Sequence, residues 1–430
     1  MILSLLEQAA RRTDQADLAW KTDETTTLSF IAGRPASAMT SQGQGINLRV
    51  IVEGRQGIAG STADAPGDLL DLAVDAARAG DPLTLLLPAG TAAFPAVITH
   101  SPRAATATIA DLAGIAALLR DRLAAERAEV NITVERTLGS VHVANTDGLD
   151  AGYDISRVIV AIECNRLRDG RLITVPALLA AAELPTLLEL ERLVATVRQR
   201  LAWAERGADA VTGRQRVAFL PDAGAVLLAP VEQALLGKAA LHGGSPLARR
   251  RGSRAFSETF TLHDDPLAAG RPGSRPVDDE GVPSQRLALV EGGSVEGFIY
   301  DLETASRVGV SPTGHGRRAT FGKPHAAFSN IVVAAGDASW DEVLTAIGDG
   351  LLVQTLRGDG QGNVSGGAFA RPASLAWRVE SAEVTGLVPE VTVAGNAHDL
   401  LGRVVALGRE VEWVGSRATP TIVVDGVSVF

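Results

Sequence analysis

Two clusters of carboxylates are the residues of this sequence best suited to do chemistry. The first is His263-Asp264-Asp265-Pro266, and the second is Asp278-Asp279-Glu280-Gly281-Val282-Pro283. Oxygen ligands of this kind can hold a divalent cation, and paired carboxylates can act as general acid and general base. An Asp before Pro or Gly also builds a turn, because its side chain accepts hydrogen bonds from nearby backbone. The sequence leaves both roles open and favours turn formation.

No other residue pattern points to a known type of catalytic group. The single cysteine, Cys164, lies in the strand-like segment AIECNRL and is interpreted as a small buried residue. There is no G-x-S-x-G nucleophile elbow, and Val364-Ser365-Gly366-Gly367 is interpreted as a glycine-rich turn. Zinc peptidases place two histidines about one helical turn apart, with a glutamate beside the first. No two histidines of this chain have that spacing; they are His100, His142, His242, His263, His315, His325 and His398.

Composition narrows the class of protein. Forty basic and fifty acidic residues give a net charge of −10, which opposes binding to a phosphate backbone. One cysteine excludes an internal disulfide and a CxxC metal site. The N-terminus lacks the basic start and long apolar core of a signal peptide, and the apolar stretches are too short to cross a bilayer. We expect a cytoplasmic protein that binds neither nucleic acid directly nor a membrane.

Three blocks position these residues, and we predict a domain from each: 1–100, 101–210 and 211–430. The first block has the order helix, paired strands, helix. The second repeats that order loosely, and Leu138-Gly139 predicts a tight turn between two of its strands. Both N-terminal blocks are predicted as α+β domains.

The third block is mainly β. It contains a predicted strand at 215–220, a helix over Ala223–Leu241 that is interrupted or started at Pro230, and later a series of short strands. Strands joined by short turns favour antiparallel sheets. The fold class is therefore predicted as α+β, with antiparallel sheets flanked by helices in the N-terminal half and a mainly-β C-terminal domain.

The third block contains, in this order, Asp264-Asp265-Pro266, Asp278 to Pro283, Leu289 to Val295, and Thr313 to Arg317. That order resembles the C-terminal domain of the TldD/PmbA family, also called the modulators of DNA gyrase. Later segments agree, including VTVAGNAHDLLGRVVALG and TPTIVVDGVSV. In the N-terminal half, GINLRVIVEGRQGIAGST followed by an amphipathic helix is similar to the family's opening, so the resemblance covers nearly the whole chain.

Within that family, TldD-type members carry an H-E-x-x-x-H helix and a late cysteine that completes a zinc site, whereas PmbA/TldE-type members lack them. Here Val231 and Leu236 stand at the two histidine positions, and Glu232 stands at the glutamate position. Ser416-Arg417-Ala418 stands where the cysteine is expected. The resemblance therefore implies a PmbA/TldE-like member with no catalytic residue, metal or cofactor of its own. A departure from the family is Gly366-Gly367-Ala368-Phe369-Ala370, which only loosely matches its G-x-F-S-like segment.

The resemblance implies the non-catalytic, metal-free subunit of a TldD/TldE-type metallopeptidase complex that degrades or trims unfolded peptides or peptide precursors. Its expected partners are a TldD-like subunit, which would hold the zinc, and a peptide, which could add as a strand to a sheet edge. The residues implied for the substrate groove are Asp265, Asp279, Gly281, Gly314 and Arg317.

Two other functions remain open. The chain could be a homodimeric peptide-binding or scaffolding protein of the same fold without a protease role. It could also be an enzyme in its own right that uses the Asp264/Asp265 and Asp278/Asp279/Glu280 carboxylates, with or without a metal.

Overall fold

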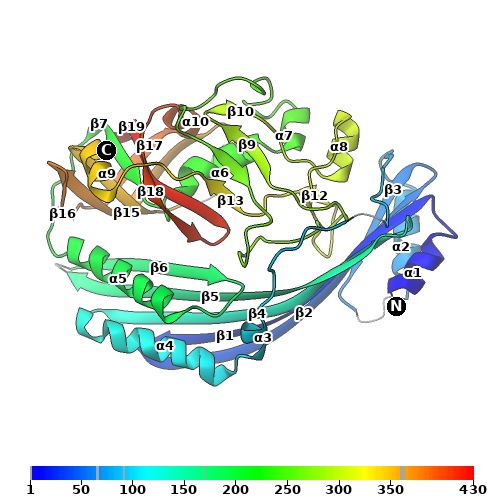
Figure 1. Ribbon diagram of the computed structural model, residues 1–430, viewed down its shortest axis with the longest axis horizontal. Coiled ribbons are helices and arrows are strands. Elements are labelled where there is room, and N and C mark those ends of the chain that lie inside the picture. The colour runs from blue at the N-terminus through cyan, green and yellow to red at the C-terminus, as the bar shows by residue number, and fades with distance from the viewer. Residues whose placement is uncertain (1, 64–66, 91–92, 169, 359–363) are drawn as a thin grey trace.

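A long six-stranded antiparallel sheet forms the floor of the molecule (Figure 1). The computed structural model describes residues 2–63, 67–90, 93–168, 170–358 and 364–430. The strand order is β3-β2-β1-β4-β5-β6, so the hairpins of the first and second blocks join through β1 and β4 in one sheet. The strands are β1 (Gln15–Ile31), β2 (Arg34–Val52), β3 (Arg55–Ser61), β4 (Glu129–Asn145), β5 (Asp150–Arg168) and β6 (Arg171–Ala181).

Helices cover the sheet at both ends. Helices α4 (Ile109–Leu123) and α5 (Leu187–Trp203) each begin with a capping box, in which Thr108 or Thr186 exchanges hydrogen bonds with the acidic residue three positions on. Their apolar faces pack on β4 and β5. At the far end α1 (Ile2–Ala9) and α2 (Leu69–Ala77) cover β1 and β2. Two short helices complete this half: α3 (Pro102–Thr106) and the 3-10 turn η1 (Ala124–Glu126).

A second, mixed sheet of eleven strands forms the C-terminal domain, which lies over the concave side of the floor (Figure 1). Its strands are β7 (Gly213–Phe219), β8 (Leu262–Asp264), β9 (Leu287–Glu291), β10 (Ser294–Val295), β13 (Ile331–Val333), β14 (Gly350–Leu356), β15 (Ala368–Glu380), β16 (Glu383–Leu387), β17 (Val391–Asn396), β18 (Val404–Val414) and β19 (Arg417–Val429). The short strands β11 (Gly316–Arg317) and β12 (His325–Ala326) pair separately. The helices are α6 (Ala225–Ala234), α7 (Gly237–Leu241), α8 (Leu302–Val308), α9 (Trp340–Ile347) and α10 (Ala397–Leu401).

The two layers share a hydrophobic core. Trp203 at the end of α5 stacks on Trp340 of α9, with 5.7 Å between ring centroids, and meets Trp377 of β15 edge-on at 5.3 Å. The same cluster of apolar side chains includes residues of α4, β5, β7 and β19. The predicted α+β class is confirmed. The predicted boundary near residue 210 falls between α5 and β7, where the chain passes from the first sheet to the second.

Two local predictions were wrong. Leu138-Gly139 is no turn, because β4 runs straight through it; a Cβ on Gly139 would lie 2.3 Å from the carbonyl oxygen of Thr22 on β1, so the glycine permits close approach of two strands. The helix predicted over Ala223–Leu241, interrupted or started at Pro230, is interrupted elsewhere: Pro230 lies inside α6, and the break falls between α6 and α7. The break follows from the backbone N–H of Gly237, which donates to the carbonyl of Ile299 at 2.9 Å instead of continuing the helix.

Among the described residues, no helix is long and apolar enough to cross a membrane.

Candidate functional site

The acidic loop 278–280 lies buried at the junction of the two layers. Asp279 accepts hydrogen bonds from Lys21 Nζ of the floor sheet at 2.5 Å and from the backbone N–H of Arg318 at 2.8 Å. Arg317 is 3.8 Å from its other oxygen. Burial alone would raise the pKa of Asp279, but Arg317 and Lys21 outweigh it and hold that pKa below its usual value. The ionised carboxylate of Asp279 therefore links the C-terminal domain to the floor sheet.

A second group of charges joins the same surfaces. Arg49 of β2 binds Asp17 of β1 through two hydrogen bonds of 2.8 and 2.7 Å, and it lies 2.8 Å from Glu280. Arg318 reaches down from the C-terminal domain to the same Asp17 carboxylate. All four side chains are almost fully buried. Two acidic and two basic buried side chains thus alternate and hold the acidic loop and the segment after β11 on the floor sheet.

Asp278 has a turn-forming role. Its carboxylate accepts the backbone N–H groups of Glu280, Val282 and Gly316 at 2.9, 2.8 and 2.7 Å. Burial nevertheless raises the pKa of Asp278 to about 6, and burial raises the pKa of Glu280 to about 7 against the opposing effect of Arg49. Both groups titrate in a range where structural carboxylates are usually ionised.

Four of the five residues predicted for a substrate groove come together beside this loop. Gly281 and Gly314 have φ values of +85° and +76°, and a Cβ on either would collide with a neighbour. They shape the backbone that carries Asp279 and Arg317. Asp265 lies apart, in the turn after β8, where it accepts the N–H of Leu267 at 2.9 Å. No hydrogen bond or ion pair within the described residues joins Asp265 to the other four, and a groove role for the five stays a prediction.

The first carboxylate cluster is also tied into the fold. His315 Nε2 lies 2.9 Å from Asp264, whose other oxygen accepts the N–H of Ser329 at 2.7 Å. Over the described ranges, no group of three or more His, Cys, Asp and Glu side chains is placed to hold a metal ion. Burial raises the pKa of the Cys164 thiol to about 12, so this cysteine is a poor nucleophile.

Two of the three zinc-position residues, Glu232 of α6 and Leu236 after it, lie at the edge of a cavity. Val231 is fully buried in the C-terminal core, and Leu236 is half-buried where the chain leaves the helix. Glu232 receives two hydrogen bonds of 2.7 Å from Arg417 at the start of β19, Nε to one carboxylate oxygen and Nη2 to the other. The pair lines a cavity of about 460 Å³, together with Leu236, Phe328, Ser329 and Ser416. A guanidinium thus neutralises the one acidic side chain of this helix.

This pair is the feature that sequence reasoning missed. Both residues were singled out for their alignment with a zinc site, but nothing in their spacing suggested that they bind each other. A signal was present, since a lone glutamate in the apolar helix AVLLAPVEQA needs a buried cation or hydrogen-bond donors.

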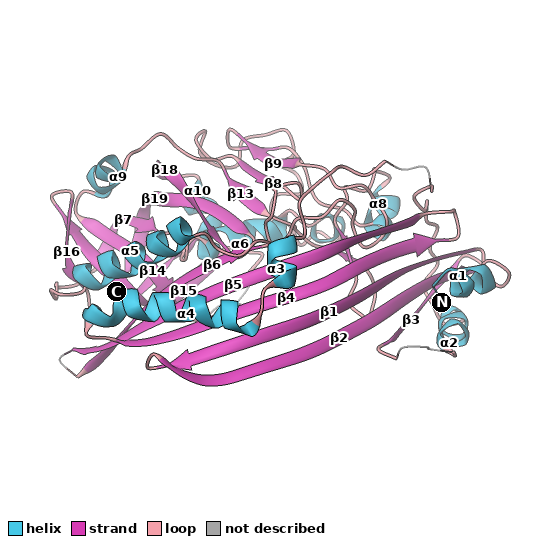
Figure 2. Ribbon diagram, turned by 60° about the horizontal axis from the view of Figure 1, so that its bottom comes forward, coloured by secondary structure: helices cyan, strands magenta, loops and turns pink. Residues whose placement is uncertain are grey.

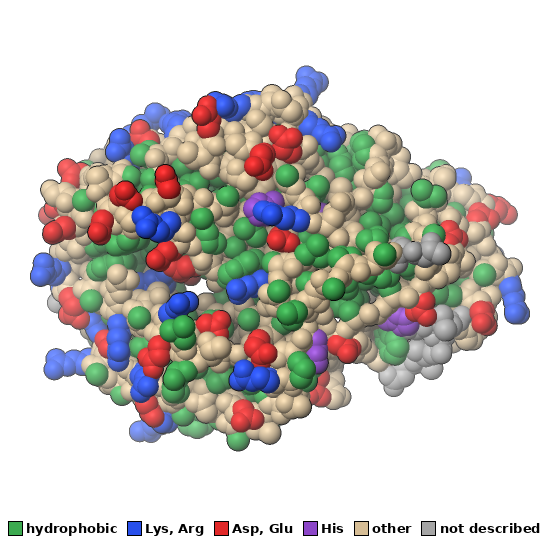
Figure 3. Space-filling model, in the orientation of Figure 1, with side chains coloured by type: hydrophobic (Ala, Val, Ile, Leu, Met, Phe, Trp, Pro, Cys, Tyr) green, Lys and Arg blue, Asp and Glu red, His purple; other side chains and the backbone are tan. Residues whose placement is uncertain are grey.

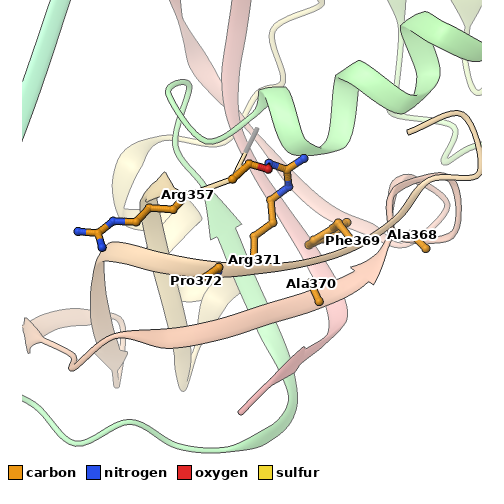
Figure 4. Close-up of a pocket in the computed structure, with 7 residues that line it drawn as sticks. Arg357, Ala368, Phe369, Ala370, Arg371 and Pro372 are labelled. Atoms are coloured by element: carbon orange, nitrogen blue, oxygen red, sulfur yellow. The ribbon is translucent and has the colours of Figure 1, made fainter. Parts of the chain in front are cut away.

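A second cavity lies at the segment that departs from the family pattern. Ala368 to Pro372 of β15 and Arg357 line a pocket of about 580 Å³ (Figure 4). Arg371 donates to the carbonyl of Gly358 across it, and the side chain of Arg357 extends away from that of Arg371. The pocket is lined by two arginines, of which Arg357 lies 3.4 Å from the carboxylate of Glu390.

Comparisons with known proteins identify relatives of this chain. Residues 212–430, slightly more than half of the chain, match the model of the PmbA/TldA metallopeptidase C-terminal domain, and residues 16–79 match that of PmbA/TldA metallopeptidase domain 1. A metalloprotease of Methanocaldococcus jannaschii is 30% identical over 201 residues, which are 46% of this chain and 44% of that protein. A metalloprotease PmbA homolog of Haemophilus influenzae is 28% identical over 213 residues, or 50% and 45%. The chain thus spans less than half the length of these curated relatives.

Solved structures extend the likeness over the full chain. TldE from Thermococcus kodakarensis superposes with a TM-score of 0.90 and 24% identity, covering 100% of this chain and 99% of that one. A putative modulator of a DNA gyrase from Thermotoga maritima gives 0.91 and 19%, with the same coverage. At these sequence identities the solved structures establish only a shared fold. Membership of the family rests on the matched family models. The chain belongs to the TldD/PmbA metallopeptidase family.

Proposed function

We propose that this chain is the metal-free subunit of a cytoplasmic TldD/TldE-type metallopeptidase complex that trims or degrades unfolded peptides. The observation that carries the proposal is the state of helix α6. Aliphatic side chains stand at both histidine positions, and Arg417 binds the glutamate that would otherwise be free to act on a metal-bound water. A glutamate bound by a guanidinium is a poor general base for such a water, so the pair supports a chain without its own metal.

In this proposal the zinc and the catalytic water belong to a TldD-like partner, and the present chain supplies a wall of the peptide site. Strand β12, which lines the α6 cavity, pairs with one strand among the described residues, β11, and an extended peptide could form backbone hydrogen bonds at its other edge. The acidic loop 278–280 then serves to fix the two layers, because its carboxylates are already bound by basic side chains and backbone N–H groups.

Direct binding to nucleic acid is not part of the proposed function. Figure 3 shows acidic and basic side chains interspersed on the visible face, with no continuous basic surface there. The net charge of −10 also opposes a polyanionic ligand.

The test is zinc content and peptide cleavage of the purified chain, alone and mixed with a TldD-like protein of the same genome. We expect neither zinc nor cleavage from the chain alone, and both from a mixed complex. Stoichiometric zinc in the chain alone would refute the proposal. Arg417→Ala with Val231→His and Leu236→His is a useful companion variant, since gain of zinc binding would support the correspondence of these positions with the zinc site.

A further inference from the structure

A groove lies between helix α5 and the strands β6 and β18. Figure 1 shows β18 reaching down towards β6, and Figure 2 shows α5 alongside β6. The groove has a volume of about 870 Å³, which is within the ~300–1,000 Å³ range of small-molecule sites. We call it the α5 groove. The charged residues that line it are Glu189, Arg192, Arg271, Glu410 and Glu412.

The charges in and next to the α5 groove do not balance. Burial lowers the pKa of Arg271 and Glu189 opposes that effect, so these two charges act on each other. Next to Glu412, Arg200 forms an ion pair of 3.1 Å with Asp222. Together the acidic residues are Glu189, Asp222, Glu410 and Glu412, and the basic residues are Arg192, Arg200 and Arg271. Negative charge is therefore in excess when all of them are ionised.

The excess of negative charge is concentrated at Glu412. Desolvation raises the pKa of Glu412 against the opposing effect of Arg200, and the carboxylates of Asp222 and Glu410 raise that pKa further. Neither Glu410 nor Glu412 has an ion-pair or hydrogen-bond partner for its carboxylate among the described residues. Arg200 is already engaged, since it binds Asp222 and donates to the carbonyl of Pro176 at 3.2 Å. Carboxylates placed close together in this way favour a cation beside them.

The edge of β6 adds backbone acceptors to the α5 groove. The carbonyl of Pro176 points away from β5, because it accepts hydrogen bonds from Gln354 and Arg200 at 3.0 and 3.2 Å. Strand β6 keeps one register with β5 throughout, so Leu178 and Ala180 point their backbone groups the same way as Pro176. Both line the groove, and no hydrogen bond from another described residue reaches their outward groups. Their carbonyl oxygens are therefore available to a donor in the groove.

Two buried side-chain oxygens near Glu412 also lack a donor. Gln354 is fully buried, and its amide lies against the carboxylate of Asp222. Thr419 of β19 is 1% exposed and lies directly opposite Glu412 on β18. Among the described residues, Oε1 of Gln354 and Oγ1 of Thr419 have no hydrogen-bond partner. Buried polar atoms are normally hydrogen-bonded, so these oxygens indicate a ligand that brings N–H groups.

We propose that the α5 groove binds an organic cation, an ammonium or guanidinium group, against the carboxylate of Glu412. Such a group balances the excess negative charge and supplies several N–H donors to the acceptors of β6. Trp413 already accommodates a guanidinium, since that of Arg271 lies 4.7 Å from the centroid of its ring. A metal ion fits less well, because no group of three or more His, Cys, Asp and Glu side chains within the described ranges is placed to hold one. This inference does not depend on the proposed function.

The test is isothermal titration calorimetry of the purified chain with n-butylammonium and with a capped Ala-Ala-Lys-Ala-Ala peptide. The same peptide with norleucine in place of lysine is the control, because it keeps an unbranched side chain and loses the charge. We expect n-butylammonium to bind and the norleucine peptide not to bind. Tighter binding of the lysine peptide than of n-butylammonium assigns the cation to a peptide side chain, and equal or weaker binding assigns it to a free amine.

Glu412→Gln tests the site itself, because it removes the charge and keeps the shape of the side chain. We expect it to weaken binding of n-butylammonium about tenfold. Glu7→Gln, which removes an exposed carboxylate of α1 at the far end of the floor sheet, should leave binding unchanged. Circular dichroism and thermal melting confirm that both variants are folded. The proposal would be overturned if n-butylammonium did not bind the wild-type chain, if Glu412→Gln bound it equally well, or if the norleucine peptide bound as tightly as the lysine peptide.

Discussion

Removal of the Arg417 guanidinium gives the sharpest test of the α6 site. In Arg417→Ala the carboxylate of Glu232, which is 10% exposed, loses its bidentate partner, whereas the side chain of Arg417 is itself 36% exposed. Breaking a fully buried pair costs ~3–5 kcal/mol, and an exposed pair contributes less than ~1 kcal/mol. With one partner buried and the other reaching solvent, we expect the free energy of unfolding to fall by ~2 kcal/mol.

We expect the loss of stability in Arg417→Ala to come from the unpaired carboxylate of Glu232. A second substitution separates this effect from lost packing. Glu232→Leu in the Arg417→Ala background removes the unpaired carboxylate and should restore ~1 kcal/mol or more. The assay is urea unfolding at neutral pH, followed by tryptophan fluorescence. Arg357→Ala is the control, because its ion pair with Glu390 is 69% and 49% exposed and should change stability by less than ~0.5 kcal/mol.

Two results would refute this reasoning. If Arg417→Ala cost no more than Arg357→Ala, the carboxylate of Glu232 would not depend on the guanidinium. If the double variant were less stable than Arg417→Ala, the loss would reflect packing at the cavity and not an unpaired charge.

Three further predictions concern the junction and the floor sheet. Asp17→Asn should lower the free energy of unfolding by ~3 kcal/mol in urea titrations, because it takes a buried carboxylate from two arginines. The pKa of Glu280 is about 7 in the folded state and 4.5 in the unfolded state, so the folded state binds the proton more tightly. The free energy of unfolding should therefore decline as pH rises from about 4.5 to 7. Glu280→Gln should flatten that decline in thermal melts at several pH values. Gly139→Ala should lower the free energy of unfolding by ~1–3 kcal/mol, because the added methyl group would overlap the Thr22 carbonyl. Gly114→Ala, on the exposed face of α4, should raise it by up to ~1 kcal/mol. Thermal melts of the two variants make the comparison.

Local chemistry predicted much of the fold. The starts of α4 and α5 carry a signal in the sequence itself, because Thr108 and Thr186 are each followed three positions on by an acidic residue and then by an apolar period. Gly139 was misread because a glycine in an alternating segment is equally consistent with a turn and with close approach of a neighbouring strand. Only the position of Thr22, far away in the sequence, decides between the two.

The candidate site was predictable as a set of positions but not as a set of contacts. The family motifs led to Glu232 and to the segment around Arg417, yet these residues are separated by 185 positions, and no periodicity links them. The same holds for Asp17 and Arg318, which are 301 positions apart. Long-range ion pairs depend on how the two sheets stack, which is set by the whole core and not by any segment.

The tryptophans that join the two layers limit how this protein can be divided. Trp203 belongs to α5, whereas Trp340 and Trp377 belong to the segment 212–430 that matches the family's C-terminal domain model. A gene fragment cut at that boundary would expose both partner rings to water and lose the arginine and lysine pairs beneath the acidic loop. The segment 212–430, although it matches a domain model of the family, therefore depends on the floor sheet for its stability. Exchange of this module between relatives would succeed only where the floor sheet supplied matching aromatic and charged residues.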